Sequence, residues 1–347
     1  MKNKIILAIE SSCDDTAAAV YCDSTELSSI VHSQIEIHNQ FGGVVPEIAS
    51  RNHTMALPTV VEQALLKANL TLKDIDYIAC TYGAGLQGAL LAGLSYSKAL
   101  AYSLHIPFLP INHIQAHIAV NFLHISPPFL SLVVSGGHTS VVYVKDYDQF
   151  EILDSTTDDA VGECFDKVAR VLNLGYPGGP VIQKHTELGV PNINFFKNAD
   201  PSHMHLSFSG LKTAVINFIR QQNPAELETK LNDICASFSK IAIDILVNNT
   251  IKLAKVHETK HIALAGGVAA NTLLRETLGA KANEMGITLV VPPFRYCTDN
   301  AAMIALCAYY QYVMTDKVAG VNQFLDLNAN SGLSIEKILN SQFSILN

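Results

Sequence analysis

The sequence predicts an α/β protein built from two similar halves, and three observations lead to that prediction. The chain has 347 residues, which exceeds the usual size of one domain and favours two. A hairpin pattern occurs once in each half. A strand that runs into a glycine turn and a helix also occurs once in each half.

The hairpin pattern consists of two apolar, strand-like runs joined by a short polar turn. The first copy has runs at residues 4–9 and 17–21, joined by the acidic turn Glu-Ser-Ser-Cys-Asp-Asp-Thr. The second copy has runs at 129–134 and 140–144, joined by Ser-Gly-Gly-His-Thr. This repeated outline indicates that the second half is an internal repeat of the first.

A strand and a glycine turn appear first at 77–88, followed by an Ala/Leu-rich helix, and the same order returns at 261–278. In the second half the hairpin and this segment are further apart, which predicts an inserted segment at about 157–212. The boundary is expected near the Ser-Pro-Pro at 126–128, with lobes at 1–125 and 126–347. Turns from the two lobes are expected to meet at a cleft, where ligands of such sheets bind.

Composition excludes several classes of protein. Hydrophobic residues make up 49% of the chain and charged residues 16%, which excludes a disordered chain. The net charge of −8 has the wrong sign for binding nucleic acid by bulk electrostatics. Seven scattered cysteines without a C-x-x-C pair, and a short first apolar run, predict a cytoplasmic protein with reduced thiols and no signal peptide. No membrane span is expected, because the weakly charged stretch at 88–104 suits a buried helix.

Glycine turns between a strand and a helix are candidate phosphate sites, because they present backbone N–H groups. Ser135–Gly137 and Gly266–Gly267 are such turns, although a glycine pair by itself more often serves only the turn. No Walker A loop occurs. Gly83–Gly88 spells G-x-G-x-x-G but lacks the acidic ribose partner about 20 residues later, which disfavours a Rossmann dehydrogenase.

Two histidines four residues apart, His113 and His117, would project from one face of a helix and could bind one metal ion. A zinc protease is disfavoured, because Ile114 stands where the zincin motif has its glutamate. Asp299 is the candidate third ligand, and two histidines with one carboxylate suit Fe(II) and accommodate zinc. The alternatives are a polar helix face for the histidines and a helix N-cap for Asp299.

Several acidic residues near the predicted loops could act as general bases or accept hydroxyl groups, or could simply be solvated turn residues. They are Asp14, Asp15, Asp158, Asp159, Glu163 and Asp166.

Taken together, these segments resemble one family, the universal tRNA threonylcarbamoyladenosine transferases, formerly classified as O-sialoglycoprotein endopeptidases. The matching blocks run in order from about residue 5 to residue 306, and Gly-Gly-His-Thr is typical of the bacterial branch. The blocks are ESSCDDT (10–16), GGVVPEIASR (42–51), His113-x-x-x-His117, VSGGHT (134–139), ECFDK (163–167), YPGGP (176–180), FSGLK (208–212), AGGVAAN (265–271) and CTDN (297–300).

The resemblance implies an actin-like fold of the sugar kinase, Hsp70 and actin type, with two ribonuclease-H-like lobes and an insertion in the second. It implies one divalent metal ion per subunit, iron or alternatively zinc, on His113, His117 and Asp299. It makes Asp14 the candidate catalytic carboxylate. The substrate-binding residues that it implies are Val133, Val134, Ser135, Gly136, Gly137, Asp166, Gly179 and Asn271.

The implied reaction moves the threonylcarbamoyl group from threonylcarbamoyl-AMP to N6 of the adenosine 3′ of the anticodon, in tRNAs that read codons beginning with A, and releases AMP. The implied partners are tRNA, a paralogous actin-like subunit of the TsaB type and a small ATPase of the TsaE type. The alternatives are an actin-like ATPase or sugar kinase, a nucleotide-binding scaffold and a metalloprotease.

The sequence departs from the family pattern at three places. Ala84 replaces a usual proline, Gln115 and Ala116 replace the usual Glu-Gly before the second histidine, and Gln183 stands where many members have aspartate. The last departure puts a ribose or threonyl contact in question.

Overall fold

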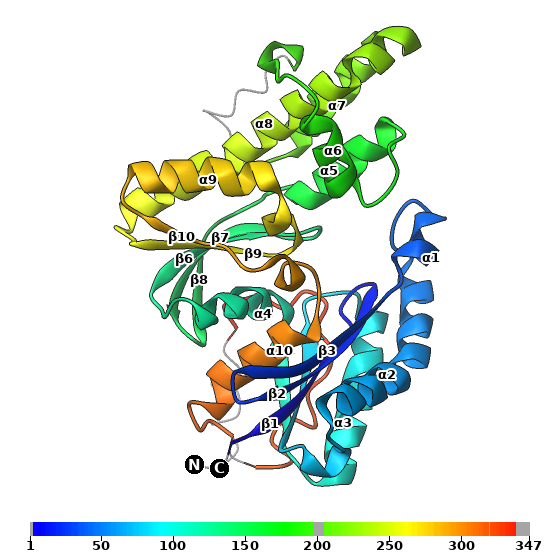
Figure 1. Cartoon of the computed structure of the whole chain (residues 1–347), viewed down its shortest axis with the longest axis vertical. Helices are drawn as coiled ribbons and strands as arrows, with labels where there is room; N and C mark the ends of the chain where they lie inside the picture. Colours follow the sequence, from blue (N-terminus) through cyan, green and yellow to red (C-terminus); the bar gives the residue numbers. More distant parts are fainter. Residues whose placement is uncertain (1–2, 197–204, 319, 338–347) are drawn as a thin grey trace. The chain divides into compact units, whose positions relative to one another are not determined.

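The computed structural model describes residues 3–196, 205–318 and 320–337 (Figure 1). The chain divides into two compact units. The first contains residues 1–127, 145–150 and 298–347, and the second contains residues 128–144 and 151–297.

The first unit is a five-stranded sheet with helices packed against it. The strands lie in the order β3-β2-β1-β4-β5, with β1 antiparallel to β2 and parallel to β4. Its elements are β1 (Ile5–Glu10), β2 (Asp15–Cys22), β3 (Thr25–Ser33), α1 (Ile35–Asn39), α2 (Pro46–Ala68), β4 (Tyr77–Gly83), α3 (Gln87–Leu104), β5 (Phe108–Asn112), α4 (His113–Ala119) and α10 (Ala301–Ala308).

Short helical turns complete the first unit. They are the 3₁₀ turns Leu72–Asp74 and Val120–Leu123 and the π-helical turn Tyr309–Val313.

The central strands of this sheet are buried along nearly their whole length, because helices cover them. β1 and β2 are rich in Ile, Ala and Val, and almost every residue in them is buried. Helices α2 and α3 lie side by side and pack on β2, β3 and β4 (Figure 1). Helix α10, whose eight residues are all buried, packs on β1 and β2.

The second unit repeats this architecture. Its strands lie in the order β10-β9-β6-β7-β8, with β6 antiparallel to β7 and parallel to β9. Its elements are β6 (Phe129–Val134), β7 (Thr139–Asp146), β8 (Gln149–Ser155), α5 (Val161–Val171), α6 (Gly178–Thr186), α7 (Ser209–Gln221), α8 (Pro224–Val256), β9 (His261–Ala265), α9 (Thr272–Glu284) and β10 (Thr288–Val290), with 3₁₀ turns at Ile193–Phe195, Gly267–Ala270 and Phe294–Tyr296.

The two hairpins and the two segments of strand, turn and helix are therefore confirmed, and so is the repeat of one architecture. Between their third and fourth strands, the first unit has the α-helices α1 and α2, whereas the described residues of the second unit form α5, α6, α7 and α8. The expected lobe 126–347 differs from the second unit of the structure, since residues 126–127 and 145–150 belong to the first unit. Residues from 298 onward group with the first unit, because α10 packs on β1 and β2.

Helix α8 is the one helix in the described part of the chain that is long and apolar enough to cross a membrane. Its most apolar window is 83% buried inside the protein, as in the core helix of a globular unit.

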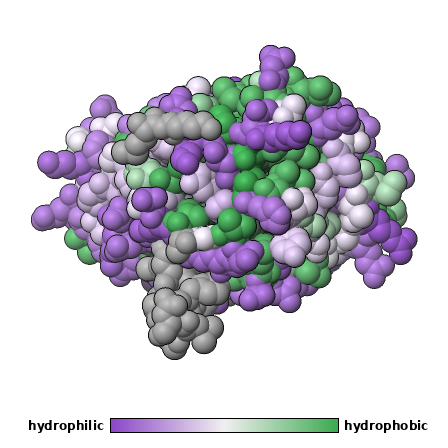
Figure 2. Space-filling model, turned by 90° about the horizontal axis from the view of Figure 1, so that it is seen from below, coloured by the Kyte–Doolittle hydropathy of each residue, from purple (hydrophilic) through white to green (hydrophobic). Residues whose placement is uncertain are grey.

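On the face drawn in Figure 2, apolar residues are exposed among polar ones, which is ordinary for protein surfaces.

Candidate functional site

His113 and His117 lie on the short helix α4, which begins where β5 ends. The Asn112 side chain caps this helix by accepting hydrogen bonds from the backbone N–H of Ile114 (2.9 Å) and Gln115 (3.2 Å). This cap makes His113 the first helical residue. His117 follows one turn later on the same face, and the ring centroids are 4.7 Å apart.

Asp299 reaches both histidines from the loop before α10. Its Oδ1 lies 3.1 Å from His117 Nε2 and 3.6 Å from His113 Nε2. The N-cap of α10 is Asn300, whose Oδ1 accepts from the Met303 N–H at 2.9 Å, so the N-cap reading of Asp299 is wrong.

The donor atoms of His113, His117 and Asp299 all lie within 4.8 Å of one another, and both histidines are buried. Two imidazole nitrogens and one carboxylate oxygen are a donor set that suits Fe(II) or zinc with positions left for other ligands. Among the described residues, the buried Nδ1 of His117 has no hydrogen-bond partner. The residues present therefore fit a metal ion.

Two further polar groups touch His113, and neither belongs to the predicted ligand set. Its Nδ1 lies 3.3 Å from Glu10 Oε2 and 3.1 Å from Ser12 Oγ. Burial lowers the pKa of His113, but Asp299 and Glu10 outweigh burial and raise that pKa to about 9. Burial raises the pKa of Glu10, but His113 and the hydrogen bond from Ser12 leave it below its usual value.

The acidic turn that carries Asp14 is fastened to α2 by the buried His53. His53 Nε2 lies 2.8 Å from the Cys13 carbonyl oxygen, which can only accept, so Nε2 donates and Nδ1 accepts from Thr16 Oγ1 at 2.7 Å. Burial raises the pKa of the adjacent Asp15 to about 7, with a smaller contribution from nearby carboxylates. Asp14 is partly exposed in this turn, and its catalytic role stays a prediction.

In the second unit, Val133 and Val134 end strand β6 with buried side chains, so any ligand contact there is through the main chain. The turn after them closes when Ser135 N–H donates to the His138 carbonyl (2.8 Å) and His138 N–H donates to Ser135 Oγ (3.1 Å). Gly136 and Gly137 are exposed, and a Cβ added at either would meet no atom within 4 Å.

Gly266 brings the second glycine turn against the first. Its φ of +90° is a conformation that favours glycine, and a Cβ there would lie 2.5 Å from the Val134 carbonyl oxygen. Asn271 follows this turn and caps α9 by accepting from the Leu274 N–H at 3.0 Å. Strands β6 and β9 are parallel neighbours, so both turns emerge at the same edge of the sheet.

Asp166 and Gly179 are brought together at the start of α6. Asp166 Oδ1 accepts from the Gly178 N–H at 2.7 Å, and a Cβ on Gly179 would meet open space. Gln183, at the departure from the family pattern, accepts from Thr272 N–H (3.2 Å) and donates to Thr272 Oγ1 (3.1 Å). Gln183 therefore binds the residue that follows Asn271.

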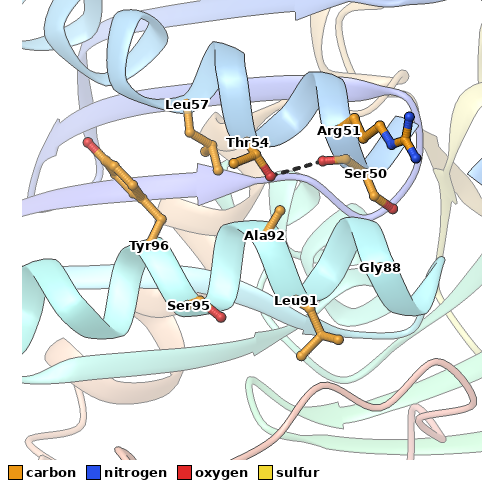
Figure 3. A pocket seen from close by; sticks show the side chains of 9 residues that line it. All are labelled: Ser50, Arg51, Thr54, Leu57, Gly88, Leu91, Ala92, Ser95 and Tyr96. Carbon is orange, nitrogen blue, oxygen red and sulfur yellow. Dashed lines mark hydrogen bonds between the residues drawn. The ribbon is translucent and has the colours of Figure 1, made fainter. Parts of the chain in front are cut away.

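A hollow of about 490 Å³ lies between α2 and α3 (Figure 3). None of the residues that the sequence predicts for the site lines it. Its polar lining includes Arg51 and Ser50, whose carbonyl accepts from Thr54 Oγ1 at 3.1 Å.

The family model for TsaD, described as tRNA N6-adenosine threonylcarbamoyltransferase, matches residues 25–306. The chain belongs to the TsaD family. The TsaD relative from Clostridium botulinum is 49% identical over 96% of this chain and 99% of its own length. The relative from Caldicellulosiruptor saccharolyticus is 51% identical over 89% of this chain and 93% of its own length. Both carry the name tRNA N6-adenosine threonylcarbamoyltransferase, and the predicted family is confirmed.

Solved structures establish the fold of this TsaD chain. HypF from T. kodakarensis superposes with a TM-score of 0.57 at 14% identity, over 92% of this chain and 49% of HypF. Together with the repeated five-stranded sheets, this likeness confirms the predicted actin-like α/β fold.

Proposed function

We propose that the chain transfers the threonylcarbamoyl group from threonylcarbamoyl-AMP to N6 of the adenosine 3′ of the anticodon, in tRNAs that read codons beginning with A. The observation that carries this proposal is its identity of 49% with a tRNA N6-adenosine threonylcarbamoyltransferase over 96% of the chain. In the reaction, N6 bonds to the carbamoyl carbon, the bond from that carbon to the phosphate oxygen breaks, and AMP leaves. One proton leaves N6.

His113, His117 and Asp299 would hold one divalent ion, iron with zinc as the alternative. When bound, such an ion supplies a Lewis acid and a template for oxygen atoms of the substrate. The buried surroundings of both histidines support this role, because they exclude water from the donor atoms.

The adenylate would bind at the sheet edge where β6 and β9 end. Gly136 and Gly137 are exposed residues of a turn that follows a strand, and a Cβ added at either would meet open space, so a phosphate could approach the main chain there. Asp166, Gly179 and Asn271 are proposed to contact the sugar, the base or the threonyl group, with Val133, Val134 and Ser135 contributing main-chain atoms.

Asp14 is the proposed acceptor of the proton that leaves N6. Its partial exposure would allow a substrate amine to approach. The hydrogen bonds of His53 to Cys13 and Thr16 would fix the turn around it.

We place the reaction in the cytoplasm, with a paralogous actin-like subunit of the TsaB type, a small ATPase of the TsaE type and no membrane. The net charge of −8 supports dependence on partners, because it opposes attraction to the tRNA phosphates. The isolated chain should accordingly bind tRNA weakly.

The test is mass spectrometry of nucleosides from unmodified tRNA incubated with threonylcarbamoyl-AMP, the chain and its proposed partners. We expect threonylcarbamoyladenosine with the unaltered chain and with His124→Ala, which removes an exposed histidine of the same unit, but not with His113→Ala.

No product from the unaltered chain beside active partners would refute the proposal. Steady ATP turnover without tRNA would then favour the actin-like ATPase.

A further inference from the structure

We propose that Glu10 is a positioning residue that orients His113 for metal binding. This role rests on the metal centre of the proposed function, and Glu10 is not one of the three predicted ligands. The role is supported by the contacts that Glu10 and His113 make with each other and with Ser12, Thr81 and Asp299.

Glu10 ends strand β1 and is fully buried. A buried carboxylate is costly unless its oxygens are hydrogen-bonded. Oε1 accepts from the Ser12 N–H at 2.5 Å, and Oε2 accepts from Thr81 Oγ1 on the neighbouring strand β4. Because these donors hold both oxygens, the carboxylate has one fixed orientation.

That orientation directs Oε2 at one particular nitrogen of His113. Nδ1 lies 3.3 Å from Oε2, while Nε2 lies 3.6 Å from Asp299 Oδ1. A carboxylate can only accept, so Glu10 favours the tautomer with the proton on Nδ1, and Ser12 Oγ, 3.1 Å from the same nitrogen, can accept from that N–H as well. When His113 is neutral, this tautomer leaves the lone pair of Nε2 on the side of Asp299, where a metal ion would bind.

His117 provides the contrast. Its Nδ1 is buried, and no residue in the described part of the chain is its hydrogen-bond partner. Only His113 of the pair therefore has a carboxylate behind it, an arrangement that in metal sites fixes the tautomer and the ring orientation.

Glu10→Gln separates this role from simple packing. The Ser12 N–H is a fixed donor, so the amide oxygen of glutamine keeps that contact, and the NH₂ group takes the place of Oε2. The NH₂ group would then donate to His113 Nδ1, which forces the proton onto Nε2 and blocks the metal. The shape of the side chain is unchanged.

Thr81→Val is the matched control. It removes the hydrogen bond from Thr81 to Glu10 and keeps both the carboxylate and the volume of the residue. It disturbs the same buried network without changing which tautomer of His113 is favoured.

The experiment measures the Kd for Zn²⁺ of the purified full chain by competition with a chromophoric chelator, beside urea unfolding of each variant. We expect Glu10→Gln to weaken Zn²⁺ binding by about 10- to 100-fold. Thr81→Val should lose clearly less Zn²⁺ affinity than Glu10→Gln, because the carboxylate and its hydrogen bond from the Ser12 N–H remain, even if the unfolding midpoint falls.

Equal Zn²⁺ affinities of Glu10→Gln and the unaltered chain would overturn the role of Glu10, as would equal losses in Glu10→Gln and Thr81→Val. Unchanged affinity in His113→Ala would overturn the metal centre itself. Weaker Zn²⁺ binding with normal threonylcarbamoyl transfer would instead overturn only the place of the metal in the proposed function.

Discussion

The turns after β1 and after β6 occupy the same position in the same strand order, but they are built in opposite ways. In the first unit, Ser11 and Ser12 are buried, and Ser12 contacts a histidine of the candidate metal centre. In the second unit, Gly136 and Gly137 are exposed, and a Cβ added at either would meet no atom within 4 Å. The same architecture thus carries a buried serine turn beside a candidate metal-binding histidine in one copy and an exposed glycine turn in the other.

The largest effect should come from removing a side chain of the first unit. Asp299→Ala deletes the carboxylate that both histidines face, so bound metal should be lost and transfer should fall by more than about 100-fold. Elemental analysis and the nucleoside assay measure the two effects. Asp326→Ala, at an exposed carboxylate of the same unit, is the control, and metal retention in Asp299→Ala would contradict the metal centre.

The second largest effect should be on stability, at the glycine turn of the second unit where Gly266 packs closely against Val134. Gly266→Ala places a Cβ 2.5 Å from the Val134 carbonyl oxygen at a φ of +90°, so unfolding free energy should fall by about 1 to 3 kcal/mol. Gly267→Ala meets open space and should change it by less than about 0.5 kcal/mol. Urea unfolding compares the two, and equal losses would show that the contact with Val134 is unimportant.

A third change tests whether the open space beside the first glycine turn is used by substrate. Gly137 has neither a positive φ nor a close neighbour, so nothing in the fold requires glycine there. Gly137→Val should leave unfolding unchanged and raise KM for threonylcarbamoyl-AMP about tenfold, or about 1.4 kcal/mol. Steady-state kinetics would detect this, and an unaltered KM would remove the turn from the substrate site.

The smallest effect concerns Asp158, which holds the start of α7. Partial burial raises its pKa, but hydrogen bonds from Ser207, Ser209 and the Phe208 N–H outweigh this and lower it to about 2. A carboxyl with a depressed pKa stabilises the fold above its ordinary pKa near 4, and this contribution is lost as pH falls toward 2.

Because Asp158 is exposed, its contribution should be below about 1 kcal/mol. Asp158→Asn should therefore unfold more easily than the unaltered chain at pH 7, and the difference should shrink as the pH falls from 4 toward 2. Urea unfolding at these pH values measures it. A difference that grows on acidification would contradict the assignment.

Local patterns predicted much of the fold and part of the site. Apolar, strand-like runs joined by polar turns predicted both hairpins, and the spacing of His113 and His117 placed them on one helix face, as observed. The structure also brings Asp299 to them, although the roles of these residues stay predictions.

Glu10 was missed because its partner Thr81 lies 71 residues away, and no local pattern reports that contact. In the sequence, Glu10 looks only like the charged end of an apolar run. For the same reason, the sequence could not predict that α10 packs beside β1, because this packing depends on contacts between segments far apart in the chain.

The return of the chain to the first unit after residue 297 also sets an order of assembly during synthesis. Residues 1–127 emerge from the ribosome first, but α10 and Asp299 emerge only after the second unit is nearly complete. The second unit can therefore fold while the sheet that begins at β1 still lacks the helix that covers it. The donor set at His113 and His117 gains its carboxylate last, so a nascent chain offers a metal ion an incomplete site until residue 299 has been synthesised.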